Sequence, residues 1–346
     1  MTPPIALFSL GGTIAMRQGP AGLVPAVDAD DLIGLVPDIS EIADVTVTQV
    51  ARVPSADVTI AHLIGTAEDI RAAVAAGAGG IVVVQGTDTI EEAAFALDLL
   101  LDVPVPVVVT GAMRPACHIS PDGPANLASA VRVAAGAEAR GLGVVVVMND
   151  EIHAARYVTK GHSALPNAFG SPSLGPVGQL REGRVVVPVR LAHRVPTVAV
   201  PTDAPPCRVA HLPVGLDDDP WFLEALASGG CDGLVVEALG GGHVPSRFAE
   251  PLGALAGRTP VVLAARTHAG ATLERSYGYA GSERDLIGRG LIPSGDLGAA
   301  KARVLLMLLL MAGAGRAEVG RDFRAAAGMT RPGAGPGLVE GDGAGP

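Results

Sequence analysis

The sequence contains few cysteines and few aromatic residues. Its three cysteines, Cys117, Cys207 and Cys231, are widely spaced and odd in number, which excludes a full disulfide framework and a CxxC zinc site. We expect them to be reduced packing residues. Aromatic residues make up only 3% of the chain, and small aliphatic residues and glycine dominate. This bias is typical of parallel sheets covered by helices.

The sequence also lacks the features of membrane, nucleic-acid and metal-binding proteins. Its longest apolar segment, VLLMLLLMAGAG after Arg303, is too short to span a bilayer and predicts a buried helix. A net charge of −10 without a basic stripe argues against a nucleic-acid partner. The eight histidines show no HxH or HExxH spacing, and no GxxxxGK[ST] pattern occurs. We therefore expect no membrane partner, no nucleic-acid partner, no metal site and no site for nucleotide phosphates.

The first residues, MTPPIALFSLGG, lack the basic start of a signal peptide. The apolar stretch is interrupted by Gly11 and Gly12, which favours a first β-strand. We expect a cytoplasmic protein.

Short apolar runs alternate with segments that have helical periodicity. The runs IALFSL, GIVVVQ, VPVVVT, GVVVVM, GLVVEAL and PVVLAA are typical of parallel strands buried on both faces. Between them, AEDIRAAVAAG and EEAAFALDLLL predict helices, and Thr89 with Glu92 predicts a capping box at the start of the second. The pattern indicates an α/β fold built from βαβ units.

A change of composition near Val185 predicts the domain boundary, because the chain there becomes rich in proline and poor in helix formers. We expect an N-terminal α/β catalytic domain over residues 1–190, a linker over 191–206 and a smaller C-terminal α/β domain over 207–327. Residues 328–346 are rich in glycine and proline and are predicted to be disordered.

Two apolar runs end in a glycine followed by a threonine, at Thr13 and at Thr87, and Asp88 follows the second. Ligands of open α/β sheets bind at the carboxyl ends of strands, where such tips lie. A threonine hydroxyl needs a nearby base to act as a nucleophile, and Lys160 is a candidate. Singly, each threonine is consistent with a cap or turn and Lys160 with a surface charge, but the repeated pattern favours hydroxyl-based covalent chemistry.

Taken together, four motifs resemble the bacterial-type L-asparaginase family. They are LFSLGGTIA, VVVQGTDTIEEAAFALDLLL, VVVTGAMRP with DGPANL, and VVVMNDEIHAARYVTK. The similarity continues through GLVVEALGGGHVP and KARVLLMLLL, so it covers nearly the whole chain. It implies a larger N-terminal domain with a flavodoxin-like parallel sheet, a smaller C-terminal α/β domain, no cofactor and assembly as a homotetramer or homodimer.

The resemblance also implies catalytic roles. Thr13 matches the threonine that attacks the side-chain amide and forms an aspartyl ester. Thr87, Asp88 and Lys160 match a second group, which activates a hydroxyl or a water molecule.

Further positions match the substrate-binding residues of the family. Ser55 matches a contact to the α-carboxylate, and Asp88 to the α-ammonium group. Gly86 and Thr87 belong to the same binding segment, and the backbone at Ala112 lies where the family contacts the amide.

The chain departs from the family pattern at three places. The lid segment MRQGPAGLVPA lacks the usual tyrosine, and Tyr277 of the C-terminal domain is a candidate substitute. Ala56 replaces a common glutamine beside Ser55. The carboxylate supplied across the subunit interface has two candidates, Glu274 and Glu283.

We therefore predict an amidohydrolase that converts L-asparagine to L-aspartate and ammonia, with weak glutaminase activity because one methylene gives little discrimination. Two alternatives remain. One is the amide-hydrolysing component of a tRNA amidotransferase, which carries an added domain before the first strand. The other is a non-catalytic amino-acid-binding or sensing protein on the same fold.

Overall fold

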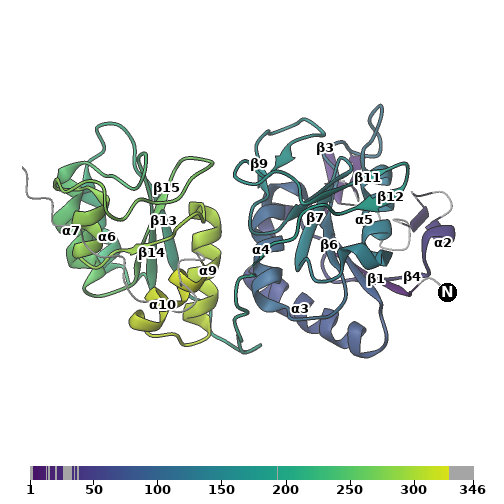
Figure 1. Ribbon diagram of the computed structural model, residues 1–346, viewed down its shortest axis with the longest axis horizontal. Helices are drawn as coiled ribbons and strands as arrows, with labels where there is room; N and C mark the ends of the chain where they lie inside the picture. The colour runs from purple at the N-terminus through teal and green to yellow at the C-terminus, as the bar shows by residue number, and fades with distance from the viewer. Residues whose placement is uncertain are drawn as a thin grey trace, which may run out of the picture.

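The computed structural model describes residues 3–12, 14, 16–19, 22–25, 33–34, 36, 39–192 and 194–326. Thr13 and the predicted disordered tail over residues 328–346 lie outside the described residues. The chain forms two lobes, each with its own sheet (Figure 1).

The first lobe contains an eight-stranded mixed sheet in the order β12-β11-β8-β7-β6-β5-β1-β4. Neighbouring strands from β4 to β7 pair in parallel, as the apolar runs predict, and β8, β11 and β12 extend the sheet in antiparallel fashion. The strands are β1 (Ile5–Ser9), β4 (Val45–Gln49), β5 (Gly80–Val84), β6 (Val107–Thr110), β7 (Val144–Met148), β8 (Glu151–Ala154), β11 (Gly178–Arg181) and β12 (Arg184–Val186).

The antiparallel extension begins at a tight turn between β7 and β8. Asn149 and Asp150 occupy it with φ angles of 52° and 62°, the left-handed conformation that two-residue hairpins require. Two small hairpins also form in this lobe: β2 (Met16–Gly19) pairs with β3 (Gly22–Pro25), and β9 (Thr159–Lys160) pairs with β10 (Phe169–Gly170).

Helices cover both faces of the first sheet. On one face, α3 and α4 pack against alternate strand residues such as Phe8 and Val83, and on the other face α5 packs against Leu7 and Val82. The helical elements are α2 (Ile39–Ile42), η2 (Ser55–Asp57), α3 (Ile60–Ala75), η3 (Thr87–Thr89), α4 (Ile90–Leu100), α5 (Gly123–Ala135) and η4 (Ala137–Ala139).

The capping box predicted at the start of α4 is wrong. Thr89 makes no capping hydrogen bond; its hydroxyl instead donates to the backbone oxygen of Ser55 at 2.9 Å. A tertiary contact between η2 and η3 therefore engages this side chain where the sequence predicts a local cap.

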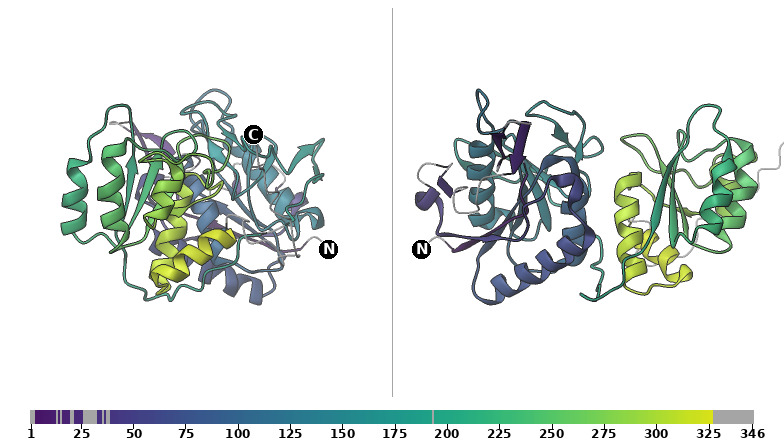
Figure 2. Two further views of the ribbon diagram at one scale, coloured as in Figure 1. Left: turned by 60° about the vertical axis from the view of Figure 1, so that its left-hand side comes forward. Right: turned by 180° about the vertical axis from the view of Figure 1, so that it is seen from behind.

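The second lobe is a four-stranded parallel sheet in the order β13-β14-β15-β16. Helices α6, α7 and α8 pack on one face, and α9 packs on the face toward the first lobe (Figure 2). The elements are β13 (Val209–Pro213), η5 (Pro220–Phe222), α6 (Leu223–Ser228), β14 (Gly233–Ala238), η6 (Ser246–Phe248), α7 (Ala249–Ala256), β15 (Val261–Ala265), α8 (Glu283–Gly288), β16 (Ile292–Pro293), α9 (Ala299–Met311) and α10 (Arg316–Ala326).

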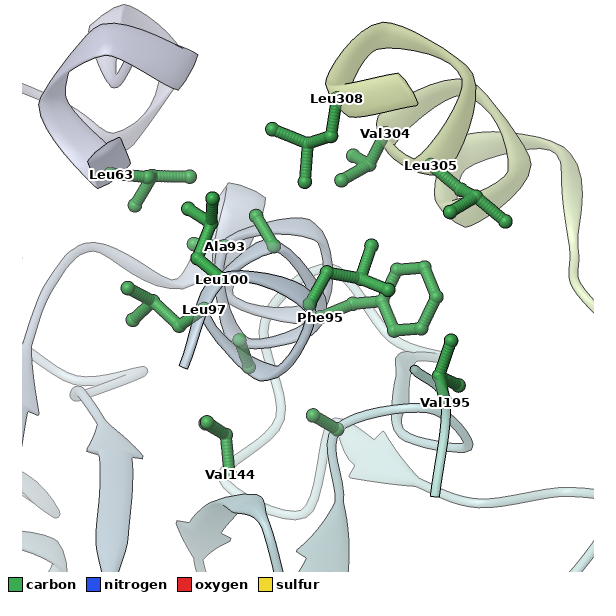
Figure 3. Packing of buried hydrophobic residues seen from close by; sticks show 14 of the residues in the cluster. Leu63, Ala93, Phe95, Leu97, Leu100, Val144, Val195, Val304, Leu305 and Leu308 are labelled. Carbon is green, nitrogen blue, oxygen red and sulfur yellow. The ribbon is translucent and has the colours of Figure 1, made fainter. Parts of the chain in front are cut away.

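The two lobes meet where α4 packs against α9. Phe95 of α4 lies against Val304, Leu305 and Leu308 of α9, and these residues belong to one apolar cluster that continues into both sheets (Figure 3). The predicted buried helix after Arg303 is therefore confirmed as α9. Because α9 is apolar around much of its circumference, it contacts the second sheet and the first lobe at the same time.

The cysteines differ in their surroundings. Cys117 is exposed, so the prediction that it is a packing residue is wrong, whereas Cys207 and Cys231 are half-buried. Burial raises the pKa of both half-buried thiols, which favours their protonated form.

Within the described part of the chain, no helix is long and apolar enough to cross a membrane.

Candidate active site

Two glycine-rich tips meet at the carboxyl end of the parallel strands. β1 and β5 are direct neighbours, with Ser9 opposite Val84, so the segments that follow them emerge side by side. Gly11 and Gly12 have φ angles of 101° and 97°, which favour glycine. A Cβ atom on Gly12 would overlap the backbone of Gly86, so the two segments approach too closely for a side chain.

Three of the predicted residues form a contact chain at this edge. Lys160 Nζ lies 2.9 Å from Thr87 Oγ1 and 2.7 Å from Asp88 Oδ1. Thr87 and Asp88 belong to η3 directly after β5, and Lys160 comes from the β9–β10 hairpin. Tertiary structure thus brings together groups more than seventy residues apart.

Ser55 joins the same group from η2. Its hydroxyl lies 3.1 Å from Asp88 Oδ2 and accepts a hydrogen bond from the Asp88 backbone nitrogen at 3.2 Å. A Cβ atom on Gly86 would fall 2.8 Å from Ser55 Oγ, so glycine is required here as well. Ser55 and Gly86 therefore lie beside Thr87 and Asp88 at this edge of the sheet.

Ala112 follows β6, the strand next to β5, and is completely buried. The preceding Gly111 lies against Thr87: a Cβ atom added to it would be 3.4 Å from Thr87 Cγ2. The backbone at Ala112 therefore borders the site. Thr13, the remaining predicted residue, lies outside the described residues.

Exposure differs sharply among the three contacting side chains. Thr87 is buried and the Lys160 side chain is 14% exposed, whereas the Asp88 side chain is 70% exposed. The hydrogen bond from Lys160 holds the pKa of the Asp88 carboxyl below its usual value, assisted by the charge of Lys160 and by Ser55 and opposed by partial burial. Asp88 is therefore ionised near neutral pH and still open to a cationic group from solvent.

Two residues to which the sequence pattern assigned no role support the neighbouring loop. Asp122 accepts hydrogen bonds from the backbone nitrogens of Met113 and Arg114, at 3.0 and 2.7 Å. Asn126 donates to the Gly111 oxygen at 3.0 Å and accepts from the Asn149 nitrogen. Both belong to the DGPANL segment. Its polar residues, which follow the end of a strand, were the feature of the sequence that could have indicated this supporting role.

The two candidate interface carboxylates lie in different environments. Glu283 is fully buried, accepts hydrogen bonds from the backbone nitrogens of Ser276 and Tyr277, and pairs with His243 at 3.1 Å. These bonds hold its pKa below the usual value even though desolvation acts in the opposite direction. Within the chain Glu283 is thus occupied in shaping its own loop, whereas Glu274 is half-buried.

The candidate substitute for the lid tyrosine lies between these two carboxylates in the chain. Tyr277 is 46% exposed and packs edge to face against His243, with ring centroids 4.9 Å apart.

The arrangement provides a hydroxyl, an amine and a carboxylate in hydrogen-bonding sequence. This is the order needed to remove a proton from a hydroxyl and to orient the group that receives it. Among the described residues, no three His, Cys, Asp or Glu side chains gather closely enough to hold a metal ion.

The sequence matches two family models. Residues 4–192 match the one described as asparaginase, N-terminal, and residues 208–323 match the glutaminase/asparaginase C-terminal domain. The chain belongs to the asparaginase family. The two-domain asparaginase fold predicted from the motifs is confirmed.

Asparaginase relatives match most of the chain. A probable L-asparaginase of Deinococcus radiodurans is 40% identical over 325 residues, covering 93% of this chain and 97% of the relative. A glutaminase-asparaginase of Acinetobacter glutaminasificans is 39% identical over 186 residues, covering 52% and 56%. The crystal structure of a probable cytoplasmic L-asparaginase from Campylobacter jejuni has a TM-score of 0.83 and 33% identity, and the match covers 93% of this chain and 99% of that one.

Proposed function

We propose that this chain hydrolyses L-asparagine to L-aspartate and ammonia through a threonine acyl-enzyme. The contact chain from Thr87 through Lys160 to Asp88, beside the glycine tip that leads to Thr13, is the observation that carries the proposal. Family membership and relatives named as L-asparaginases support the same reaction.

The reaction has two steps in this proposal. The Thr13 hydroxyl attacks the side-chain amide carbon, its proton passes to the departing nitrogen, and ammonia leaves. Water then attacks the resulting ester and releases aspartate and the threonine hydroxyl. The Thr87–Lys160 pair moves the proton of the attacking group, with the Thr87 hydroxyl as the link between that group and the Lys160 amine 2.9 Å away.

Asp88 and Ser55 hold the substrate's α-substituents. Asp88 is exposed and ionised, so it pairs with the α-ammonium group. The Ser55 hydroxyl, which contacts Asp88 in the free protein, turns its proton toward the α-carboxylate. Glutamine has one extra methylene, so we expect it to react more slowly rather than to be rejected.

The first test is ammonia release from asparagine and glutamine, measured side by side with a coupled assay. We expect release from asparagine, and no detectable release from a Thr13→Ala variant. Binding of asparagine without turnover in the unmodified protein would support the non-catalytic alternative instead.

Two further variants test the proton-transfer roles. Lys160→Met and Thr87→Ala should each lower kcat by about 10²–10⁴-fold, the range that positioned acid–base groups contribute. Circular dichroism checks that both remain folded. A near-normal kcat in either variant removes that residue from the mechanism.

We also propose a cytoplasmic homotetramer, with a homodimer as the smaller possible assembly. The family resemblance supports the assembly, and the similarity to the probable cytoplasmic L-asparaginase from Campylobacter jejuni supports the location. Light scattering of the purified protein should give four times the chain mass of 34.7 kDa. A mass equal to one chain contradicts both assemblies.

A further inference from the structure

Lys301 is a cation buried at the junction between the two lobes. It lies in the first turn of α9, is 6% exposed, and donates hydrogen bonds to two backbone oxygens of the first lobe. These are the oxygens of Arg156, at 3.0 Å, and of Val158. The Lys301 side chain, which belongs to the second lobe, therefore holds the backbone of a turn in the first lobe at Arg156 and Val158.

That turn leads directly into the strand that carries Lys160. Val158 is followed by β9, a strand of two residues whose sheet partner is the equally short β10. Such a short hairpin has little stability of its own, since isolated two-stranded ribbons are marginal. The position of Lys160 therefore depends on what holds the segment before it.

The segment has a second attachment to the same lobe. The Arg156 guanidinium pairs with Asp296 and donates to the Ala326 oxygen. Asp296 lies just before α9, and Ala326 ends α10. The turn at residues 156–158 is thus held from the second lobe through both its backbone and one side chain.

The same helix contacts the other half of the site. α9 packs against α4, which begins one residue after η3, the element that carries Thr87 and Asp88. Helix α9 thus connects the two elements whose separation sets the distances from Lys160 to Thr87 and Asp88.

The amino-acid composition sets these positions apart. Lys160 and Lys301 are the only two lysines in the sequence. Histidine aside, every other basic residue is an arginine. A compact ammonium with three donors suits a buried position between two carbonyl oxygens better than a planar guanidinium does.

We infer that Lys301 is a positioning residue, which holds the segment before β9 so that Lys160 reaches Thr87 and Asp88. The expected effect of Lys301 on turnover rests on the proposed function. The expected effect of Lys301 on the position of Lys160 does not.

The test compares two variants of α9. Lys301→Met removes the contacts to the first lobe. Arg303→Met is the matched control, because the Arg303 guanidinium also donates to a backbone oxygen, that of Val209, but within the second lobe. Lys301→Met loses two contacts to backbone oxygens and Arg303→Met loses one, both from the same helix, and only Lys301→Met loses contacts to the segment before Lys160.

We expect Lys301→Met to lower kcat for asparagine by about 10–100-fold, the effect of a displacement of about one ångström in a catalytic group. KM should change less than threefold, because Asp88 and Ser55 remain in place. Arg303→Met should keep the original kcat. An unchanged kcat in Lys301→Met, or an equal fall in both variants, overturns the inference.

A second readout does not need turnover. With ¹³C-labelled lysine, the protein has two side-chain Cε signals, and Lys301→Met leaves only that of Lys160. We expect that remaining signal to move and hydrogen exchange to accelerate over residues 156–161, with neither change in Arg303→Met. A Lys160 signal and exchange rates identical to the original protein overturn the inference even if the enzyme is active.

Two outcomes separate the inference from the proposed function. If the unmodified protein releases no ammonia, the proposed function fails, and the lysine signal still decides whether Lys301 positions Lys160. If Lys301→Met does not fold, Arg156→Met removes the second attachment of the same segment. It should then lower kcat with KM preserved and shift the Lys160 signal, which is identified as the one missing from Lys160→Met, and the absence of both effects overturns the inference.

Discussion

Position 12 requires glycine because two backbone segments approach each other closely there, and not because the chain must be flexible. Its φ angle of 97° and the overlap of an added Cβ with Gly86 both oppose any side chain. Because the same approach sets the distance between the segment leading to Thr13 and the one leading to Thr87, a change here affects the site as well as stability.

We predict that Gly12→Ala destabilises the protein by about 1–3 kcal/mol, the usual cost of a strained backbone position. It should also lower asparagine turnover at least tenfold. Urea unfolding and the ammonia assay measure the two effects.

Gly65→Ala is the control. Gly65 lies inside α3, and an added Cβ meets no atom within 4 Å. Alanine there should be neutral or stabilise by about 0.5–1 kcal/mol, because it reduces the entropy of the unfolded chain. Equal destabilisation by both substitutions contradicts the proposed close approach.

At the scale of the element, α4 connects the active-site edge to the junction between the lobes. It begins next to Thr87 and Asp88, and its Phe95 is completely buried between α9 and the segment at Val195 (Figure 3). Packing on α4 therefore supports both the site and the contact between the lobes.

We predict that Phe95→Ala lowers the free energy of unfolding by about 3–5 kcal/mol, through lost apolar burial and a residual cavity. Leu216→Ala, at a side chain that is 96% exposed, should change it by less than about 0.5 kcal/mol. Urea titrations followed by circular dichroism compare the two. A small effect of Phe95→Ala contradicts its placement in the shared core.

At the scale of the whole molecule, Lys301 at the junction between the lobes makes the stability of the protein dependent on pH. Its pKa is lowered to about 8, chiefly by burial and also by the charge of Arg156, while Glu91, Glu92 and Asp296 oppose the shift. Burial also raises the pKa of Glu92, with Glu91 adding to the rise. A neutral amine still has two N–H donors for the two backbone oxygens, so the contact survives deprotonation.

The effect on stability has a definite sign. Between pH 8 and 10.5 the unfolded chain keeps the Lys301 proton while the folded chain has lost it, so stability from this group rises with pH. The free energy of unfolding of the original protein, minus that of Lys301→Met, should therefore increase by about 3 kcal/mol at most across this range. A difference that is constant or falls with pH contradicts the placement of a buried lysine.

The order of the apolar runs was sufficient to predict the parallel strands, because strands buried on both faces must be apolar throughout. It did not predict β8, whose residues Glu151 and His153 break the apolar pattern. That strand depends on the left-handed turn at Asn149 and Asp150 and on the open edge of β7 beside it. The domain boundaries at residues 190 and 207 stay predictions, as do the catalytic roles.

The sequence by itself determined the fold class and the chemical types at the site, because apolar periodicity and short motifs are local properties of the chain. Thr87 and Asp88 could be found in this way, since they adjoin an apolar strand. Only the tertiary structure decided that Thr89 binds Ser55 instead of capping α4, and that Lys301 holds the segment before Lys160. Both contacts join residues far apart in the chain, so they depend on how the elements pack and leave no periodic pattern in the sequence.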